Sequence, residues 1–292
     1  MNIISILRIV LIVITIATTL IVLKDVFAHK DELKGKPSEW FTLAIIGFVT
    51  NFFDTWGIGS FAPTQASFKF TKASPDDTVP GTLNVGDTLP VSVEAILFLT
   101  FVDIEPLTLV TMLVASAAGA YIGAGIVSKW NIKTIRYVLG AVLFLVAIIT
   151  ACKNAGVGPF GTSGTALGLA GIKLVIGVVC NFFLGAFMMV GCGLYAPCTA
   201  LCAILGMNIK TAFPIMMGSC ALLMNVSVFK FVKEGKYDRR ATLMLMFPGA
   251  LGVFVAYLTL SYAFSLTTLT YIICVVMVIT ALMYFKDAKK SA

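Results

Sequence analysis

The sequence predicts an all-α integral membrane protein of two inverted-topology repeats, each with about five helical segments and broken or re-entrant helices, plus an extra N-terminal helix. Three observations favour this fold: an apolar composition, a sequence match between the two halves, and basic loops at non-equivalent places in those halves. Of the 292 residues, 59% are hydrophobic and 12% are charged, whereas soluble domains contain about 25% charged residues. A transmembrane helix needs about 20 apolar residues, so the chain has room for roughly nine to eleven spans.

The composition also excludes some classes of function. A mean hydropathy of +0.99 leaves too few polar residues to cover a soluble domain. The formal net charge of +7 does not indicate a nucleic-acid partner, because membrane proteins collect basic residues in their cytoplasmic loops. The expected partners are the lipid bilayer and a small solute. A second copy of the chain, in a homo-oligomer, is a further candidate partner.

Residues 1–38 are predicted to form an N-terminal transmembrane helix and a cytoplasmic loop. An apolar run covers residues 3–23, and a charged stretch follows it up to Glu39. The run lacks a small-residue cleavage site, so we expect a retained helix, with a cleaved signal peptide as the alternative.

The first repeat is expected over residues 39–153. Its opening apolar segment, residues 40–70, is interrupted by Gly57, Gly59 and Pro63. Because glycine and proline disfavour one straight helix, we predict two short segments meeting at a break, as two short spans or one re-entrant hairpin. The rest of the repeat is predicted as a polar loop followed by three spans, at about 71–88, 89–102, 106–128 and 133–151.

A Gly-rich linker, residues 154–165, separates this repeat from a second one over residues 166–292. Asn51-Phe52-Phe53 matches Asn181-Phe182-Phe183, and the run Gly57-Ile58-Gly59-Ser60-Phe61-Ala62-Pro63 matches Gly191-Cys192-Gly193-Leu194-Tyr195-Ala196-Pro197. A duplication is the simplest explanation, and chance similarity of apolar sequence is the alternative. Apolar runs of the second repeat lie at about 166–190, 193–206, 211–232, 241–262 and 267–285.

The distribution of charge predicts that the repeats have opposite orientations. In the first half the loop between the last two spans is basic, with Lys129, Lys133 and Arg136, whereas in the second half the earlier loop at 233–240 is basic and the later one around 263–268 has no charge. Basic loops stay in the cytoplasm, so the copies insert in opposite directions, as in secondary transporters. The linker and the N-terminus are then outside, and the C-terminus is inside a multi-pass cell membrane protein.

Paired Gly/Pro-interrupted segments in inverted halves point to a transporter binding site. A helix that begins within the membrane has unpaired N–H groups at its positive dipole end, and glycine lets an anion approach the main chain. The alternative is that the glycines only let helices pack, as Gly119 and Gly123 are expected to do. Pro63 and Pro197 mark the breaks. The candidate substrate-binding residues are Asn51, Thr55, Gly57, Ile58, Gly59, Ser60, Asn181, Gly191, Cys192, Gly193, Leu194, Tyr195 and Cys198.

Two acidic residues within apolar segments are candidates for ion coupling. Burial of an ionisable side chain such as Asp54 or Glu94 in a membrane costs free energy, so a functional role is the first hypothesis for each of them. Either one could carry a proton or bind a sodium ion, and Asp54 could instead cap the broken helix. In contrast, Lys69, Lys173 and Lys230 are expected to extend to the membrane interface.

The seven cysteines do not predict a metal or disulfide site. Cys192, Cys198 and Cys202 lack the paired short spacing of zinc ligands, and the sole histidine lies in a charged loop. We expect no metal, no cofactor and no enzymatic activity. Pro197-Cys198 leaves a membrane thiol-electron carrier as a minor alternative, and a passive anion channel is the other rival to a secondary transporter.

The Asn-Phe-Phe and Gly-x-Gly…Ala-Pro segments of both halves resemble the sulfite exporter TauE/SafE family. So do residues 205–207, 212–220 and 235–238, and the resemblance covers about residues 40–285. It implies a permease for small sulfur-containing anions, such as sulfite or an organosulfonate, coupled to a proton or sodium gradient. The glycine-rich run typical of the family is reduced here to Gly57 and Gly59, so the resemblance leaves room for a larger organic anion.

Overall fold

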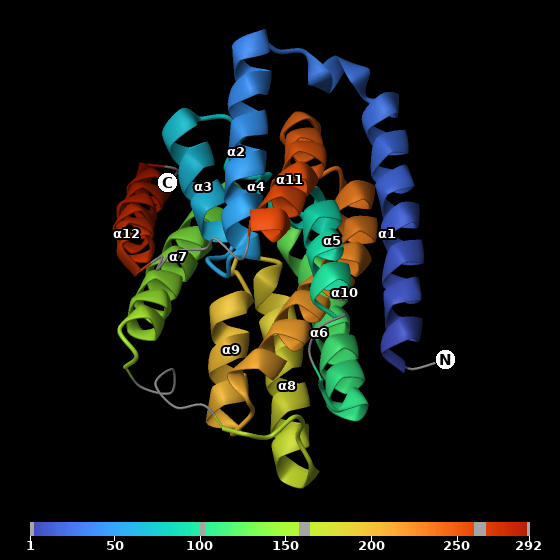
Figure 1. Cartoon of the computed structure of the whole chain (residues 1–292). Coiled ribbons are helices and arrows are strands. Elements are labelled where there is room, and N and C mark those ends of the chain that lie inside the picture. Colours follow the sequence, from blue (N-terminus) through green and yellow to red (C-terminus); the bar gives the residue numbers. More distant parts are fainter. Residues whose placement is uncertain (1–2, 100–102, 158–163, 260–266, 291–292) are drawn as a thin grey trace.

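The computed structural model describes residues 3–99, 103–157, 164–259 and 267–290, and these are helical apart from loops and one isolated bridge between Ala166 and Met207 (Figure 1). The all-α prediction is confirmed. The first half contains α1 (Ile3–Ala28), a 3-10 helix η1 (Lys30–Leu33), α2 (Pro37–Thr55), α3 (Phe61–Thr71), α4 (Val79–Gly86), α5 (Thr88–Phe98), α6 (Pro106–Val127) and α7 (Ile132–Asn154). The second half contains α8 (Gly171–Met188), α9 (Tyr195–Ile204), α10 (Ile209–Glu234), α11 (Arg239–Thr259) and α12 (Thr267–Lys290).

The predicted break in the segment 40–70 is confirmed. Residues 56–60 separate α2 from α3, and residues 189–194 separate α8 from α9 at the matching place. In Figure 1, α2 runs to its break from one end of the molecule and α8 runs to its break from the opposite end. Both breaks therefore lie in the middle of the helical bundle.

The polar loop predicted at 71–88 is wrong over much of its length. Residues 79–86 form α4, and every residue of this helix is buried. Proline at the start of the helix is compatible with it. The side chain of Asn84 finds partners inside the protein, donating to the carbonyl oxygens of Pro80 at 2.8 Å and Met188 at 3.3 Å. Polar composition predicted solvent exposure, but this segment is buried and the amide nitrogen of Asn84 finds its hydrogen-bond partners within the fold.

Six helices of the described residues are long and apolar enough to span a membrane: α1, α6, α7, α8, α10 and α11. The estimate of nine to eleven spans is higher because it divided the apolar residues into full-length helices. Three of the apolar segments instead form helices of only 10 or 11 residues, namely α3, α5 and α9. Parts of the predicted spans and linkers lie outside the described residues, at 100–102, 158–163 and 260–266.

The main helix contacts repeat when each helix is exchanged for the one at the same place in the other half. The helix α2 packs on α11 as α8 packs on α6, and α5 packs on α11 as α10 packs on α6. The pairs α5–α10 and α7–α12 join equivalent helices. The helices α2 and α8, which lead into the two breaks, thus each pack mainly on a helix of the other half.

Glycines allow the two long interfaces to close tightly. A Cβ added to Gly119 of α6 would lie 1.9 Å from the carbonyl oxygen of Phe182 in α8, and one added to Gly123 would lie 2.7 Å from that of Ala186. In the other interface, a Cβ on Gly47 of α2 would lie 2.1 Å from the carbonyl oxygen of Met244 in α11. These positions have no room for a side chain, so the packing role expected for Gly119 and Gly123 is confirmed.

Ion pairs join the loops at one end of the bundle. Arg239 binds Asp25 at 2.7 Å and Glu32 at 2.5 Å, which ties the start of α11 to the end of α1 and to η1. A second cluster links the end of α3 to the start of α7 and the end of α12. Its contacts are Lys69–Asp76 at 2.7 Å, Lys69–Asp287 at 2.8 Å and Arg136–Asp76 at 2.8 Å.

Two of the lysines expected at the membrane interface are engaged within the protein. Lys69 is 8% exposed and paired with Asp76 and Asp287, so its predicted extension to the interface is wrong. Lys173 donates to the carbonyl oxygen of Leu205 at 3.1 Å. One of the two acids that hold Lys69, Asp287, lies near the other end of the chain, which is why the position of Lys69 near a span end was misleading.

The α6–α8 interface gives a direct test of the packing. We expect Gly119→Ala to lower the free energy of unfolding by about 1–3 kcal/mol, because the added methyl group overpacks the contact with Phe182. The measurement is the thermal unfolding midpoint of the purified protein in detergent. Gly125→Ala, on the same helix, is the control, since the nearest atom to its added Cβ is 3.9 Å away. Equal midpoints for the two variants would contradict the tight interface.

Candidate functional site

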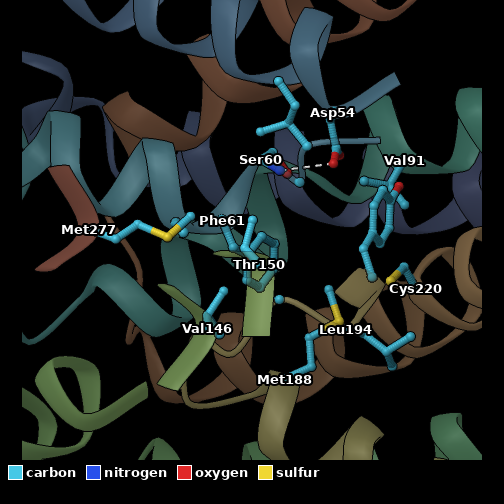
Figure 2. A pocket seen from close by; sticks show the side chains of 15 residues that line it. Asp54, Ser60, Phe61, Val91, Val146, Thr150, Met188, Leu194, Cys220 and Met277 are labelled. Atoms are coloured by element: carbon cyan, nitrogen blue, oxygen red, sulfur yellow. Dashed lines mark hydrogen bonds between the residues drawn. The ribbon is translucent and has the colours of Figure 1, made fainter. Parts of the chain in front are cut away.

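The two helix breaks line one pocket in the middle of the bundle (Figure 2). Residues from Asp54 to Ala62 approach from one side, and Met188 and residues 193–195 approach from the other. The remaining lining residues come from α5, α7, α10 and α12. They are Val91, Val146, Thr150, Cys220 and Met277. Segments more than 120 residues apart, such as Gly59 and Gly193, therefore share one site.

Glycines give both breaks a backbone that other residues rarely adopt. Gly57, Gly59 and Gly191 have φ angles of 87°, 91° and 94°, in the left-handed region that favours glycine. A Cβ on Gly57 or Gly59 would have no atom within 4 Å, whereas one on Gly191 would lie 2.9 Å from a methyl carbon of Leu139. The first break borders open space and the second is packed.

A side chain connects the two breaks directly. Gln65, in α3, donates from Nε2 to the carbonyl oxygen of Gly191 at 2.7 Å, and its side chain is fully buried. The carbonyl of Gly191 belongs to no helix and lies in the protein interior, so this bond satisfies it. The predicted site did not include Gln65. The available signal was its polar side chain close to a helix break, where backbone groups need hydrogen-bond partners.

The helices that leave the two breaks begin in the same way. Phe61-Ala62-Pro63 starts α3, and Tyr195-Ala196-Pro197 starts α9. Each proline is the third residue of its helix, where the missing N–H has no intrahelical role. Pro63 and Pro197 therefore lie just after the breaks and not at them. The first N–H groups of both helices, with the positive ends of two helix dipoles, are directed towards the region between the breaks.

Asp54 caps the start of α3. Its Oδ1 accepts a hydrogen bond from the N–H of Ser60 at 2.8 Å, and the side chain is 1% exposed (Figure 2). This is the capping role that the sequence left open for Asp54. It also means that the Ser60 N–H is already occupied by a carboxylate oxygen in this conformation.

Glu94 and Asp87 are the other carboxyl groups buried near the pocket. Glu94 accepts a short hydrogen bond from the hydroxyl of Tyr195, so it contacts the second break from α5. Asp87 accepts from Asn51 Nδ2 at 3.1 Å and is 0% exposed. It was missed as a candidate because it lies in the segment predicted to be a solvent-exposed loop. A carboxylate three residues after Asn84 in an otherwise uncharged run was the available signal.

The structure brings some of the predicted binding residues to the pocket and not others. Ile58, Gly59, Ser60, Gly193, Leu194 and Tyr195 line it together with Asp54. The remaining candidates lie behind the lining or beside it: Asn51, Thr55, Gly57, Glu94, Asn181, Gly191, Cys192 and Cys198.

Asn51 and Asn181 hold helices at equivalent places in the two halves. Asn181 Nδ2 donates to the carbonyl oxygen of Met112 at 2.8 Å and to Ser219 Oγ at 3.0 Å. Asn51 Nδ2 donates to the carbonyl oxygen of Gly47 at 3.0 Å and to Asp87. The Oδ1 atoms of both asparagines are buried and have no hydrogen-bond partner. The matched pair therefore serves the packing of α2 and α8 in this conformation.

The cysteines of α9 are buried. Cys198 and Cys202 are 0% and 1% exposed, and Cys220 of α10 lines the pocket as an unpredicted residue. All seven cysteines are free thiols. In the described residues, no group of three or more His, Cys, Asp or Glu side chains is arranged to hold a metal ion.

The pocket is small in this conformation. Its volume is about 30 Å³, enough for one or two water molecules, so it is narrower than an anion of four heavy atoms requires. A larger cavity of about 480 Å³ lies at the ion-pair end, next to Lys69, Asp76 and Arg136. The start of α3 faces the pocket and its end carries Lys69, about 12 Å further along the helix at 1.5 Å per residue.

Backbone strain at the first break can be tested with two glycines of the same pocket. We expect Gly59→Ala to lower the free energy of unfolding by about 1–2 kcal/mol, because L-residues are strained at positive φ. Gly193→Ala is the matched control, since it has no positive φ and its added Cβ would lie 3.8 Å from the nearest atom, Phe61 Cβ. Thermal unfolding of both variants in detergent is the measurement. A loss of stability no larger for Gly59→Ala than for Gly193→Ala would contradict the backbone assigned to this break.

Comparison with known proteins gives one match. The family model of the sulfite exporter TauE/SafE matches residues 3–150, just over half of the chain. The matched region begins in α1 and contains the first break, whereas the resemblance noted from the sequence began near residue 40 and extended to the second half. Neither a curated protein nor a solved structure matches the chain.

Proposed function

The chain belongs to the sulfite exporter TauE/SafE family, and from this premise we propose that it is a secondary transporter that binds its anion between the two helix breaks. The family and the six candidate spans make it a multi-pass membrane protein that transports sulfite or a related anion across the membrane. The substrate class we propose is a small sulfur-containing anion, either sulfite or an organosulfonate.

The observation that carries this proposal is the meeting of two helix starts at one pocket. Phe61 and Tyr195 begin their helices at the pocket lining, and helix N-termini bind anions through free N–H groups and the dipole. We assign the main chain around residues 57–60 and 191–194 to the anion, with Asn51, Thr55 and Asn181 supporting the breaks. Tyr195, Cys192 and Cys198 shape the surroundings.

The exchange symmetry of the helix contacts supports an origin as two inverted repeats. A pseudo-two-fold axis relating α2 to α8 and α6 to α11 accounts for the matching interfaces α2–α11 and α8–α6. With the axis in the membrane plane, the two breaks are re-entrant from opposite sides and meet near the midplane. Alternating access then consists of one repeat rocking against the other, which widens the pocket on one side at a time.

We further propose that transport is coupled to a proton or sodium gradient through Asp54 or Glu94. Both carboxyl groups are buried within contact distance of a break, Asp54 through Ser60 and Glu94 through Tyr195. A passive channel would need no such coupling. Uphill accumulation of the anion in liposomes under an ion gradient distinguishes the transporter from the channel.

A charge substitution in the pocket tests the anion site. We expect Leu194→Asp to weaken sulfite binding to the purified protein by at least about tenfold, because a carboxylate at this position repels the anion in a site of low dielectric constant. Leu194→Asn is the matched control, since it has the same shape without the charge, and thermal unfolding checks that both fold. Binding is measured by calorimetry. Equal affinities for the two variants would rule out an anion at this pocket.

Replacement of a thiol addresses the electron-carrier alternative. Cys198→Ser is expected to retain sulfite transport within about twofold, because buried thiols are inert in disulfide exchange. Transport by the variant in liposomes is the measurement, and capture of a mixed disulfide between the wild-type protein and thioredoxin is the second readout. Loss of activity together with a mixed disulfide would favour the electron carrier.

The side of the membrane that holds the ion-pair end can also be tested. We propose that this end, with the loop 235–238 and the C-terminal residues Lys286, Lys289 and Lys290, faces the cytoplasm, because basic segments are retained there. A green fluorescent protein fused to the C-terminus is then expected to fluoresce, and an alkaline phosphatase fused at the same place is expected to be inactive. The reverse pattern would invert the orientation.

A further inference from the structure

The proposed anion pocket is bordered by three carboxyl groups that are removed from water. Asp54, Asp87 and Glu94 are 1%, 0% and 0% exposed. Asp54 lines the pocket, Glu94 bonds to the lining residue Tyr195, and both Asp87 and Glu94 are close enough to Asp54 for mutual electrostatic repulsion. An anion that enters the pocket therefore meets carboxyl groups of its own sign if these are ionised.

No positive charge balances these three groups within the described part of the chain. Each carboxyl accepts a hydrogen bond from a neutral donor: the Ser60 N–H, the Asn51 amide or the Tyr195 hydroxyl. The titratable groups that face them are the Tyr195 hydroxyl of α9 and the Cys220 thiol of α10.

Several basic side chains on the neighbouring helices are engaged elsewhere. On α11, Arg239 pairs with Asp25 and Glu32, and Arg240 pairs with Glu39. On α3, Lys69 pairs with Asp76 and Asp287, and on α10, Lys230 lies 4.5 Å from the ring centroid of Tyr121. Three buried carboxylates without a counter-ion would be very costly in a membrane interior.

Two of the carboxyl groups each have an oxygen that nothing in the described structure contacts by a hydrogen bond. Asp87 Oδ2 and Glu94 Oε1 are fully buried and unpartnered, and so is Asn51 Oδ1, whose amide nitrogen binds Asp87. Each of these free carboxyl oxygens can take up a proton without the loss of an existing hydrogen bond. The three acids do not converge as ligands of one metal ion would, since no such group occurs among the described residues.

We propose that Asp54, Asp87 and Glu94 take up protons when the anion binds, so that protons and the anion cross the membrane together and in the same direction. Asp87, which does not line the pocket itself, is a proton-binding residue of this cluster. The inference rests on the proposed transport function. Protonation removes the repulsion at the pocket and so favours anion binding, whereas a proton that competed with the substrate would do the opposite. The direction of transport then follows the proton gradient, and an inward gradient drives uptake.

The experiment uses the full-length protein in liposomes that contain a trapped pH-sensitive dye, in potassium buffers without sodium. The probe is methanesulfonate, because its sulfonate stays ionised at neutral pH and carries no proton itself. We expect entry of the anion down its own gradient to acidify the lumen, and an inward proton gradient to accumulate it. A flux of methanesulfonate that leaves the lumen pH unchanged, makes it alkaline or requires sodium overturns cotransport with protons but leaves the proposed function intact. If the protein transports neither methanesulfonate nor sulfite, both the cotransport with protons and the proposed function are overturned.

The role of Asp87 is tested by the pH dependence of binding in detergent. If binding takes up protons, the dissociation constant of methanesulfonate rises with pH by up to about tenfold per pH unit for each proton. Asp87→Asn mimics the protonated acid and is expected to bind the anion at neutral pH while lowering this slope by about one proton and abolishing part of the lumen acidification. The control is Asp31→Asn, at a side chain 93% exposed in the loop before α2. An unchanged slope in Asp87→Asn would assign the residue a purely structural role.

Discussion

The pocket depends on a conflict between the membrane and the backbone. An interrupted helix leaves N–H and C=O groups without partners, and a lipid-facing break would cost several kcal/mol for each such group. Here the breaks at 56–60 and 189–194 lie inside the bundle, where other parts of the chain satisfy them. Asp54 accepts from the N–H of Ser60, and Gln65 donates to the carbonyl oxygen of Gly191. The helices α3 and α9 both begin at the pocket lining, so the site is built directly on the two breaks.

Tight helix packing keeps these breaks in place. The helices α2 and α8, which lead into the breaks, each lie against a helix of the other half along a glycine-lined interface. A carbonyl oxygen of the partner helix occupies the space of a side chain at Gly47 and Gly119. Because each half contributes one break and holds the other, the halves are interdependent. The shape of the pocket therefore depends on both halves, since both of them line it.

Charge is separated by depth in this molecule. Arginine and lysine side chains at one end pair with acids near the ends of other helices, as Arg239 does with Asp25 of α1 and Lys69 does with Asp287 of α12. The interior near the pocket contains acids without basic partners in the described residues, with Asp87 and Glu94 each presenting a free oxygen. The first arrangement stabilises the loops by ordinary ion pairing. The second is unstable unless protons or cations are bound, which links the electrostatics of the site to its function.

The sequence by itself determined the class of protein and the two breaks. The apolar composition excludes a soluble fold. The repeated Gly-x-Gly…Ala-Pro sequence marks both helix interruptions, because only glycine readily adopts the positive φ found at Gly57 and Gly191. Tertiary structure alone decided which polar residues are buried. Residues 79–86 and Asp87 have the composition of a loop, yet they lie inside, because α10 and α11 cover them and Asn51 and Met188 supply hydrogen-bond partners. Asn51 lies 36 residues from Asp87, and Asp287 lies near the other end of the chain from Lys69, so the local sequence showed neither the burial of Asp87 nor the full set of partners of Lys69.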